Sequence, residues 1–268
     1  MQYKVNGTTL TYDAQGTRSW GDNIVLLERA IDLSAGTNWS GDGYTIEKVF
    51  SANLSAEFFR QAELLILDLW KSAGLMVDDN FPLDQYHTLA RDLTTHLAAI
   101  EKTRLLSTKE FPMGIALLEE RLSEYFGIPL EVKNPYDAQS VFHFRVIRPG
   151  SHDNNPLHRD VWLDDYDDCI NLYIPIAGSN EHSSLLVIPG SHRWPESRVE
   201  RTNAGAVIEG KKFNVPAVTA IHGPYEIVRP NPRRNEMIIF SPYLVHGGAV
   251  NFNIATTRVS IEIRLWRK

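Results

Sequence analysis

Hydrophobic residues follow two different periods along this chain. Between residues 55 and 74 they recur every three or four positions, which is typical of one face of a helix. The apolar positions of this stretch are Phe58, Phe59, Ala62, Leu65, Ile66, Leu69 and Trp70. Ser55 is the expected N-cap, and Gly74 is expected to end the helix. The same reasoning predicts a second helix over residues 83–104 and a third over residues 113–126.

From residue 139 onward, short runs of β-branched and aromatic residues replace the helical period. These runs cover residues 141–147, 170–176, 184–188, 237–240 and 258–266. Short strands without helices between them indicate an antiparallel sandwich or barrel rather than a parallel α/β sheet. The stretch 195–235 is rich in Gly and Pro, and we expect it to be a long, irregular insertion.

These patterns predict one domain over residues 1–268, mainly β with α in class (α+β). Residues 1–50 alternate short β-like runs with turn signals and precede the predicted helices. We expect residues 1–138 to form a β and helical layer and residues 139–268 to form a β-barrel core that this layer supports.

Composition and charge narrow the functional classes. With 43% hydrophobic and 22% charged residues, the chain has the balance of a soluble globular protein. The formal net charge of -6 and the absence of a run of Lys and Arg argue against a nucleic-acid partner. No stretch reaches the length of a membrane span or a signal peptide, so we expect no membrane partner and a cytoplasmic location. The single cysteine, Cys169, excludes an intramolecular disulfide and a cysteine-based zinc cluster.

Candidate metal ligands begin at His158 and Asp160. Residues two apart point to the same face of a strand, so this imidazole and this carboxylate can aim at one point. Such a tripeptide is a weak signal alone, since a surface loop with an ordinary ion pair would look the same. His246 favours a metal site over a surface loop, because it ends an apolar run just before Gly247 and Gly248. Two histidines and one carboxylate are a suitable set for a divalent first-row metal with open positions.

A candidate anion site follows at Arg258 and Ser260. The two side chains share one face of the last predicted strand, where a guanidinium can grip a carboxylate with two hydrogen bonds and the hydroxyl can add another. A buried arginine needs an anionic partner. The alternative is an internal ion pair with an Asp or a Glu.

These residues resemble the phytanoyl-CoA dioxygenase-like family of Fe(II)- and 2-oxoglutarate-dependent oxygenases. Three segments carry the likeness: His158-x-Asp160, the run Leu-Leu-Val-Ile-Pro-Gly-Ser-His over residues 185–192, and His246 with Arg258. The likeness covers roughly residues 141–265. Family members usually have an Asn-Gly pair just before the Leu of that run, where this chain has His-Ser-Ser at residues 182–184.

The resemblance implies a double-stranded β-helix, which is a jelly-roll or cupin-like barrel, with non-haem iron near one mouth. It implies that His158, Asp160 and His246 hold the metal, and that Arg258 and Ser260 bind the distal carboxylate of the cosubstrate 2-oxoglutarate. The implied reaction uses O2, releases succinate and CO2, and hydroxylates an unactivated C–H bond of a small molecule such as a natural product, a sugar or an amino-acid derivative. Related halogenases have a small residue in the position of Asp160, so the carboxylate favours hydroxylation, desaturation or ring closure.

Other residues have two interpretations each. His143 can contact the oxo acid or be a core histidine, and Trp162 can line the substrate cavity or pack in the barrel. Arg145 is a candidate for the substrate side. Asp164, which begins the acidic run 164–168, can contact substrate or lie in a solvated loop.

Other classes of function remain open at this point. They are a cupin-like metal-dependent isomerase, a dioxygenase that needs no oxo acid, and a non-catalytic metal-binding barrel. The anion clamp of Arg258 and Ser260 distinguishes the first two from an oxo-acid-dependent oxygenase, since neither has a use for it.

Overall fold

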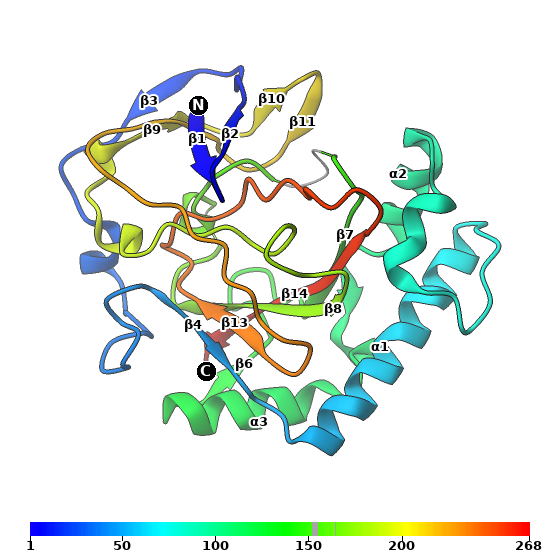
Figure 1. Ribbon diagram of the computed structural model, residues 1–268. Helices are drawn as coiled ribbons and strands as arrows, with labels where there is room; N and C mark the ends of the chain where they lie inside the picture. Colours follow the sequence, from blue (N-terminus) through cyan, green and yellow to red (C-terminus); the bar gives the residue numbers. More distant parts are fainter. Residues whose placement is uncertain (152–154, 164) are drawn as a thin grey trace.

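A computed structural model describes residues 1–151, 155–163 and 165–268. Its largest sheet has the strand order β4-β13-β8-β14-β7-β5, with β6 paired to β14, and all of these pairs are antiparallel (Figure 1). The strands of this sheet are β4 (Tyr44–Glu47), β5 (Leu106–Ser107), β6 (Leu130–Glu131), β7 (Val141–Ile147), β8 (Cys169–Ala177), β13 (Met237–Phe240) and β14 (Arg258–Arg267). The predicted runs 141–147, 170–176, 237–240 and 258–266 are therefore confirmed as strands.

Strand β14 shows how the two faces of this sheet differ. Val259, Ile261, Ile263 and Leu265 are buried in the hydrophobic core that the helices cover. The residues between them face the opposite side, because successive side chains of a strand alternate. The sheet thus has one apolar face toward the helices and one interior face toward the barrel.

Helices α1 (Ala52–Ser72) and α3 (Ile115–Phe126) pack against the apolar face, and α2 (Leu93–Lys102) lies beside α1 (Figure 1). The first prediction placed the N-cap four residues too far along, since Ser51 is the N-cap and Ser55 is buried inside α1. The predicted second helix is wrong as one element. It divides into a 3-10 helix, η2 (Leu83–Thr88), and α2, which begins where the Asp92 carboxylate accepts a hydrogen bond from the Thr95 N–H.

The third predicted helix is confirmed. Gly127 follows it with a φ of 66°, a left-handed conformation that glycine adopts without strain. The remaining 3-10 helices are η1 (Leu26–Arg29), η3 (Thr108–Glu110), η4 (Asp160–Trp162), η5 (Ser191–Arg193) and η6 (Glu196–Arg198).

A second group of strands closes the other side of the barrel, at the top of Figure 1. It contains a three-stranded sheet of order β12-β9-β3 and two hairpins, β1-β2 and β10-β11. The bounds are β1 (Gln2–Val5), β2 (Thr8–Thr11), β3 (Arg18–Trp20), β9 (Val199–Thr202), β10 (Ala206–Ile208), β11 (Lys211–Phe213) and β12 (Val218–Ile221). Residues 195–235 are thus not the irregular insertion that the Gly and Pro content predicted, because β9 to β12 lie within them. The run 184–188 forms no strand; Val187 makes only isolated bridges.

The architecture is α+β with a jelly-roll-like barrel, as predicted. Strand β3 pairs with β9, and β4 pairs with β13, so residues 1–138 contribute strands to both sheets besides the supporting helices. Among the described residues, no helix combines the length and the apolar character that crossing a membrane requires.

Candidate metal centre and adjoining cavities

The backbone brings His158 and His246 together across an isolated antiparallel bridge. Each backbone N–H donates to the carbonyl oxygen of the other residue at 2.9 Å, and the ring centroids are 4.4 Å apart. Gly247 permits this approach. Its φ is 102°, and a Cβ atom there would lie 2.4 Å from the Pro156 carbonyl oxygen.

Both imidazoles have a fixed orientation. Nδ1 of His158 lies 2.8 Å from the Pro156 carbonyl oxygen, and Nδ1 of His246 lies 3.0 Å from the Leu244 carbonyl oxygen. A carbonyl oxygen only accepts, so each Nδ1 carries the proton and donates it. Each Nε2 therefore has a free lone pair, which is the form in which histidine binds a metal.

Asp160 completes the cluster. Its Oδ1 lies 3.3 Å from Nε2 of His158 and 3.8 Å from Nε2 of His246. The three ligand atoms lie within 4.8 Å of one another, and all three residues are buried. The sequence prediction that these residues converge is thus met by the geometry.

Arg264 holds the other oxygen of Asp160. Its Nη2 and Nε donate to Oδ2 at 2.9 and 3.2 Å, which leaves Oδ1 for the side of the histidines. Burial alone would raise the pKa of Asp160, but the charge of Arg264, with the two histidines, lowers it well below its ordinary value. Burial and the neighbouring His158 lower the pKa of His246 to about 4, so its ring is neutral at neutral pH. The cluster therefore presents one carboxylate oxygen and two imidazole Nε2 atoms with free lone pairs.

The segment that carries His158 and Asp160 is anchored from behind by Arg159. This side chain is fully buried, forms an ion pair with Glu196, and donates to the Ser191 carbonyl oxygen at 2.6 Å. Trp162 donates from Nε1 to Glu196 at 2.8 Å. Trp162 packs in the barrel wall and does not line the cavities described below, because the 3-10 helix η4 replaces the strand on which the predicted alternation depended.

The interior face of β14 forms a row of polar side chains: Arg258, Ser260, Glu262 and Arg264. Glu262 accepts a hydrogen bond from Nε of Arg145 on β7 at 2.7 Å. Burial would raise the pKa of Glu262, but the charge of Arg145 lowers it to about 2. Glu262 is therefore ionised, and it is the one acidic group of the row.

Arg258 forms no ion pair within residues 1–151, 155–163 and 165–268. It donates to the Ser183 carbonyl oxygen at 3.2 Å, and its guanidinium lies 5.5 Å from the centre of the Tyr173 ring. Its Nε and the Oγ of Ser260 are buried without a hydrogen-bond partner in the described part of the chain. No Asp or Glu of the described residues thus lies within ion-pair distance of Arg258, although its charge helps to lower the pKa of Glu262. Buried polar atoms without partners are rare, and here they fit a polar ligand.

Two adjoining cavities connect these groups. The smaller, of about 40 Å³, is lined by Arg258, His158 and His246 among others, and the larger, of about 520 Å³, by His158 and Asp160 among others. The residues common to both are Arg145, Ile147, Asn155, His158 and Arg264. The candidate metal ligands thus lie between a small basic recess and a larger open chamber.

The remaining predicted residues divide between these spaces. Arg145 lines both cavities. His143 lines only the larger one; the register of β7 places it opposite Glu262, whereas Arg258 is opposite Ile147. The structure therefore does not bring His143 to the Arg258 and Ser260 pair. Asp164 lies outside the described residues.

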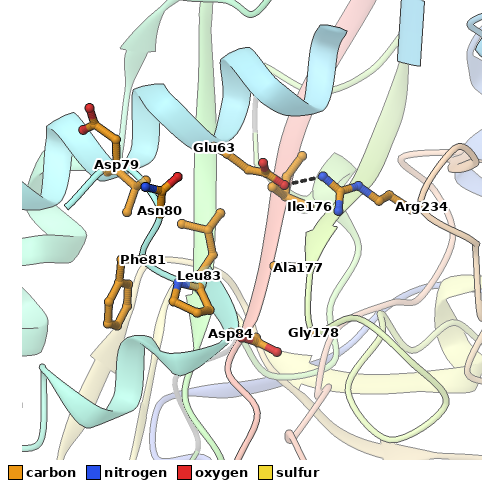
Figure 2. Close-up of a pocket in the computed structure, with 12 residues that line it drawn as sticks. Glu63, Asp79, Asn80, Phe81, Leu83, Asp84, Ile176, Ala177, Gly178 and Arg234 are labelled. Carbon is orange, nitrogen blue, oxygen red and sulfur yellow. Dashed lines mark hydrogen bonds and ion pairs between the residues drawn. The ribbon is translucent and has the colours of Figure 1, made fainter. Parts of the chain in front are cut away.

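A third cavity, of about 500 Å³, lies elsewhere on the molecule. Figure 2 shows Glu63 of α1 paired with Arg234 across it, with Asp79 and Asp84 nearby. Its lining contains none of the three clustered metal-ligand residues. The site with a ligand cluster is therefore the chamber at His158.

Sequence reasoning missed Arg264, Glu262, Glu196 and Asn171. Arg264 and Glu262 follow Arg258 at even spacing along β14, so extending the strand alternation would have found both. Asn171 lies on β8 opposite Arg264, and neither atom of its amide has a partner among the described residues. Glu196 carries no comparable signal, because only the folded chain brings it to Arg159.

No family model and no curated protein matches the chain. Among solved structures, EctD from S. alaskensis, solved with 2-oxoglutarate and 5-hydroxyectoine, has a TM-score of 0.50 and 16% identity over 96% of this chain and 86% of its own. EvdMO1 has a TM-score of 0.50 and 18% identity over 88% of this chain and 50% of its own. AviO1 from Streptomyces viridochromogenes Tue57 has a TM-score of 0.48 and 18% identity over 88% of this chain and 95% of its own. The likeness to EctD and EvdMO1 shows that the chain shares their fold.

Proposed function

We propose that this protein is a non-haem Fe(II)- and 2-oxoglutarate-dependent oxygenase that hydroxylates a C–H bond of a small molecule. One observation carries the proposal: Arg258, a buried cation that forms no ion pair among the described residues, lines the same recess as His158 and His246. An isomerase or an oxo-acid-independent dioxygenase has no use for an anion clamp beside its metal.

The donor set fits iron. Two neutral imidazoles and one carboxylate on one side of a metal leave positions for a cosubstrate and oxygen. Hydrogen bonds to the Pro156 and Leu244 carbonyl oxygens hold the two Nε2 atoms toward the centre, and Arg264 holds Asp160 so that one oxygen remains for the metal.

The charge of the recess fits a dicarboxylate. Three arginines supply three positive charges and two carboxylates supply two negative ones, so these five side chains together carry one net positive charge (three minus two). They are Arg145, Arg258, Arg264, Asp160 and Glu262. Arg258 would bind the distal carboxylate of 2-oxoglutarate, and the Ser260 hydroxyl would donate a further hydrogen bond to it. The small recess adjoins the larger chamber, so the dicarboxylate would extend from Arg258 toward His158 and His246.

Iron, 2-oxoglutarate and O2 together would supply the oxidising chemistry: one oxygen atom of O2 would go into succinate as CO2 is released, and the other into the hydroxylated product. The chain contributes orientation and shielding: the buried walls exclude water from the ligand cluster, and the larger chamber holds the substrate against it. The shared fold with EctD, whose structure contains 2-oxoglutarate and 5-hydroxyectoine, supports this reading.

An anaerobic Fe(II) titration with and without 2-oxoglutarate tests the proposal. We expect a weak visible charge-transfer band only when both are present. His158→Ala should abolish the band, and Arg258→Gln should require at least about tenfold more 2-oxoglutarate, since a charged hydrogen-bond partner is lost. Arg267→Gln is the matched control, because Arg267 is on the same strand but is partly exposed and pairs with Asp168.

Each failure has a distinct meaning. If iron binds but 2-oxoglutarate has no effect on the spectrum, the proposal is wrong and the result indicates a metal enzyme that needs no oxo acid. No iron binding at all would leave a barrel without a metal function.

A further inference from the structure

The larger cavity has one apolar wall and one basic rim. The apolar wall comes from α2, where Leu93 and Leu97 are 47% and 56% exposed and Ile100 packs beside them. Large aliphatic side chains exposed at the mouth of a cavity are characteristic of a ligand site rather than of a solvated helix face. A ligand with an apolar body would cover this wall.

The rim is basic although the whole chain carries a formal charge of -6. The charged residues in the described lining are Arg104, Arg145, Lys211, Lys212, Arg264 and Asp160. Arg264 and Arg145 are already paired, with Asp160 and Glu262. Arg104 and Lys212 form no ion pair with any residue that the structure describes. Two cations are thus left to face the chamber.

His143 adds a neutral hydrogen-bond donor to the lining of the larger cavity. Its Nδ1 accepts a hydrogen bond from the Leu105 N–H at 3.0 Å, so the proton of the ring must be on Nε2. Burial and the nearby arginines lower the pKa of His143 to about 3, so the ring does not become a third cation at neutral pH. An Nε2–H group in a cavity wall selects a substrate oxygen that accepts.

We propose that the substrate is an anion with an apolar body, held by its carboxylate or phosphate at Arg104 and Lys212. The apolar body lies along Leu93, Leu97 and Ile100, and an acceptor oxygen near the reacting carbon receives the His143 Nε2–H. This inference rests on the proposed function only in taking the chamber as the substrate site. It excludes neutral sugars, which would leave the leucine wall in contact with hydroxyl groups.

A matched pair of fluorescent probes tests the inference without iron or 2-oxoglutarate. Anilinonaphthalene sulfonate is an apolar anion, and phenylnaphthylamine is the same ring system without the charge. We expect the full-length protein to bind the anion more tightly than the neutral probe. Octanoate should displace the anion at lower concentration than octanol does.

Variants locate the binding. Arg104→Gln with Lys212→Gln should weaken binding of the anionic probe by up to about fivefold for each charge, the effect of a partly exposed ion pair, and should leave the neutral probe unchanged. Leu97→Ser should weaken both probes. Lys109→Gln, an exposed cation outside the cavity, is the control and should change neither.

Equal affinity for the two probes would overturn the inference. So would a preference for the anion that survives the loss of Arg104 and Lys212, because the probe would then be bound elsewhere. The iron titration decides the proposed function separately, so either result can fail while the other stands.

Discussion

At the scale of single residues, Arg264 is the side chain on which the candidate metal centre most depends. Asp160 is about 1% exposed, and Arg264 is the only Arg or Lys among the described residues that forms an ion pair with it. Removing one member of a buried pair leaves an uncompensated charge and typically costs about 3–5 kcal/mol. We therefore expect Arg264→Gln to lower the free energy of unfolding of the metal-free protein by about 3 kcal/mol in urea denaturation.

Two further variants check that the loss comes from the pair. Adding Asp160→Asn to Arg264→Gln should recover part of the stability, because the buried charge is then gone. Arg267→Gln removes a partly exposed pair and should cost under about 1 kcal/mol. Equal losses for Arg264→Gln and Arg267→Gln would show that Asp160 does not need its partner.

His143 gives a prediction for pH dependence. Its folded pKa, about 3, is below the ordinary 6.5, so the unfolded chain binds a proton that the folded chain does not as pH falls below about 6.5. Acidification therefore removes stability that is fully present above that pH. His143→Asn keeps an acceptor for the Leu105 N–H and removes this titration.

The stability gap between wild type and His143→Asn should thus change with pH. When the pH is lowered from about 7.5 to about 5, wild type should lose up to about 2 kcal/mol more free energy of unfolding than His143→Asn does. Urea denaturation at the two pH values measures the shift. A gap independent of pH would mean that His143 titrates alike in the folded and unfolded chains.

At the scale of elements, η6 supports the segment that carries His158 and Asp160 through Glu196. Glu196 pairs with the fully buried Arg159 and accepts the Trp162 Nε1–H. Glu196→Gln leaves Arg159 without a full counter-charge, and we expect it to cost about 3 kcal/mol and to weaken iron binding.

Urea denaturation and the anaerobic iron titration measure the two effects of Glu196→Gln. Glu200→Gln, which removes a partly exposed pair with Arg18 on neighbouring strand β3, should cost under about 1 kcal/mol and leave the iron affinity unchanged. If Glu196→Gln unfolds as wild type does, Glu196 does not support the segment.

The elements that the sequence predicted well are those with one strong local pattern. Strands β7 and β13 have the predicted bounds, and α3 ends at a glycine in a left-handed conformation. The prediction of one second helix was wrong because an apolar period continues across the break between the two elements. The 3-10 helix η2 ends before Leu89, and α2 begins after its N-cap, Asp92. The strands within residues 195–235 were missed because each is only three or four residues long, and because β9 pairs with the distant strand β3.

The residues of the candidate site also fall into two groups, those that a local sequence pattern predicted and those that it did not. His158, Asp160, His246 and Arg258 were found from motif spacing, which is a local property of the sequence. The strand alternation used for His158 and Asp160 does not apply, because Asp160 begins the 3-10 helix η4; it does apply to Arg258, which lies in β14. Glu196 and the apolar wall of α2 could not, since tertiary packing alone brings them to their places. Trp162 was assigned by strand alternation, which does not hold in the 3-10 helix where it lies.

At the scale of the whole molecule, the barrel and the helical layer share one core. Phe58, Ile66 and Trp70 of α1 lie in the same buried cluster as Ile261 and Ile263 of β14, and β4 completes the main sheet beside β13. Residues 139–268 contain every candidate ligand but would expose this apolar sheet face if they were separated from residues 1–138. We therefore expect a fragment of residues 139–268 to lack cooperative unfolding and to bind iron no better than an unstructured peptide.

Circular dichroism during a thermal ramp measures whether the fragment unfolds cooperatively, and the anaerobic iron titration measures whether it binds iron. The full chain is the reference in both. Burial of large apolar side chains contributes about 1.5–3 kcal/mol each, so loss of the helical half removes far more than the typical net stability of a domain. A fragment that melts cooperatively and binds iron would show that the barrel is an independent unit. The helices would then serve the substrate cavity, through Leu93 and Leu97, rather than the fold.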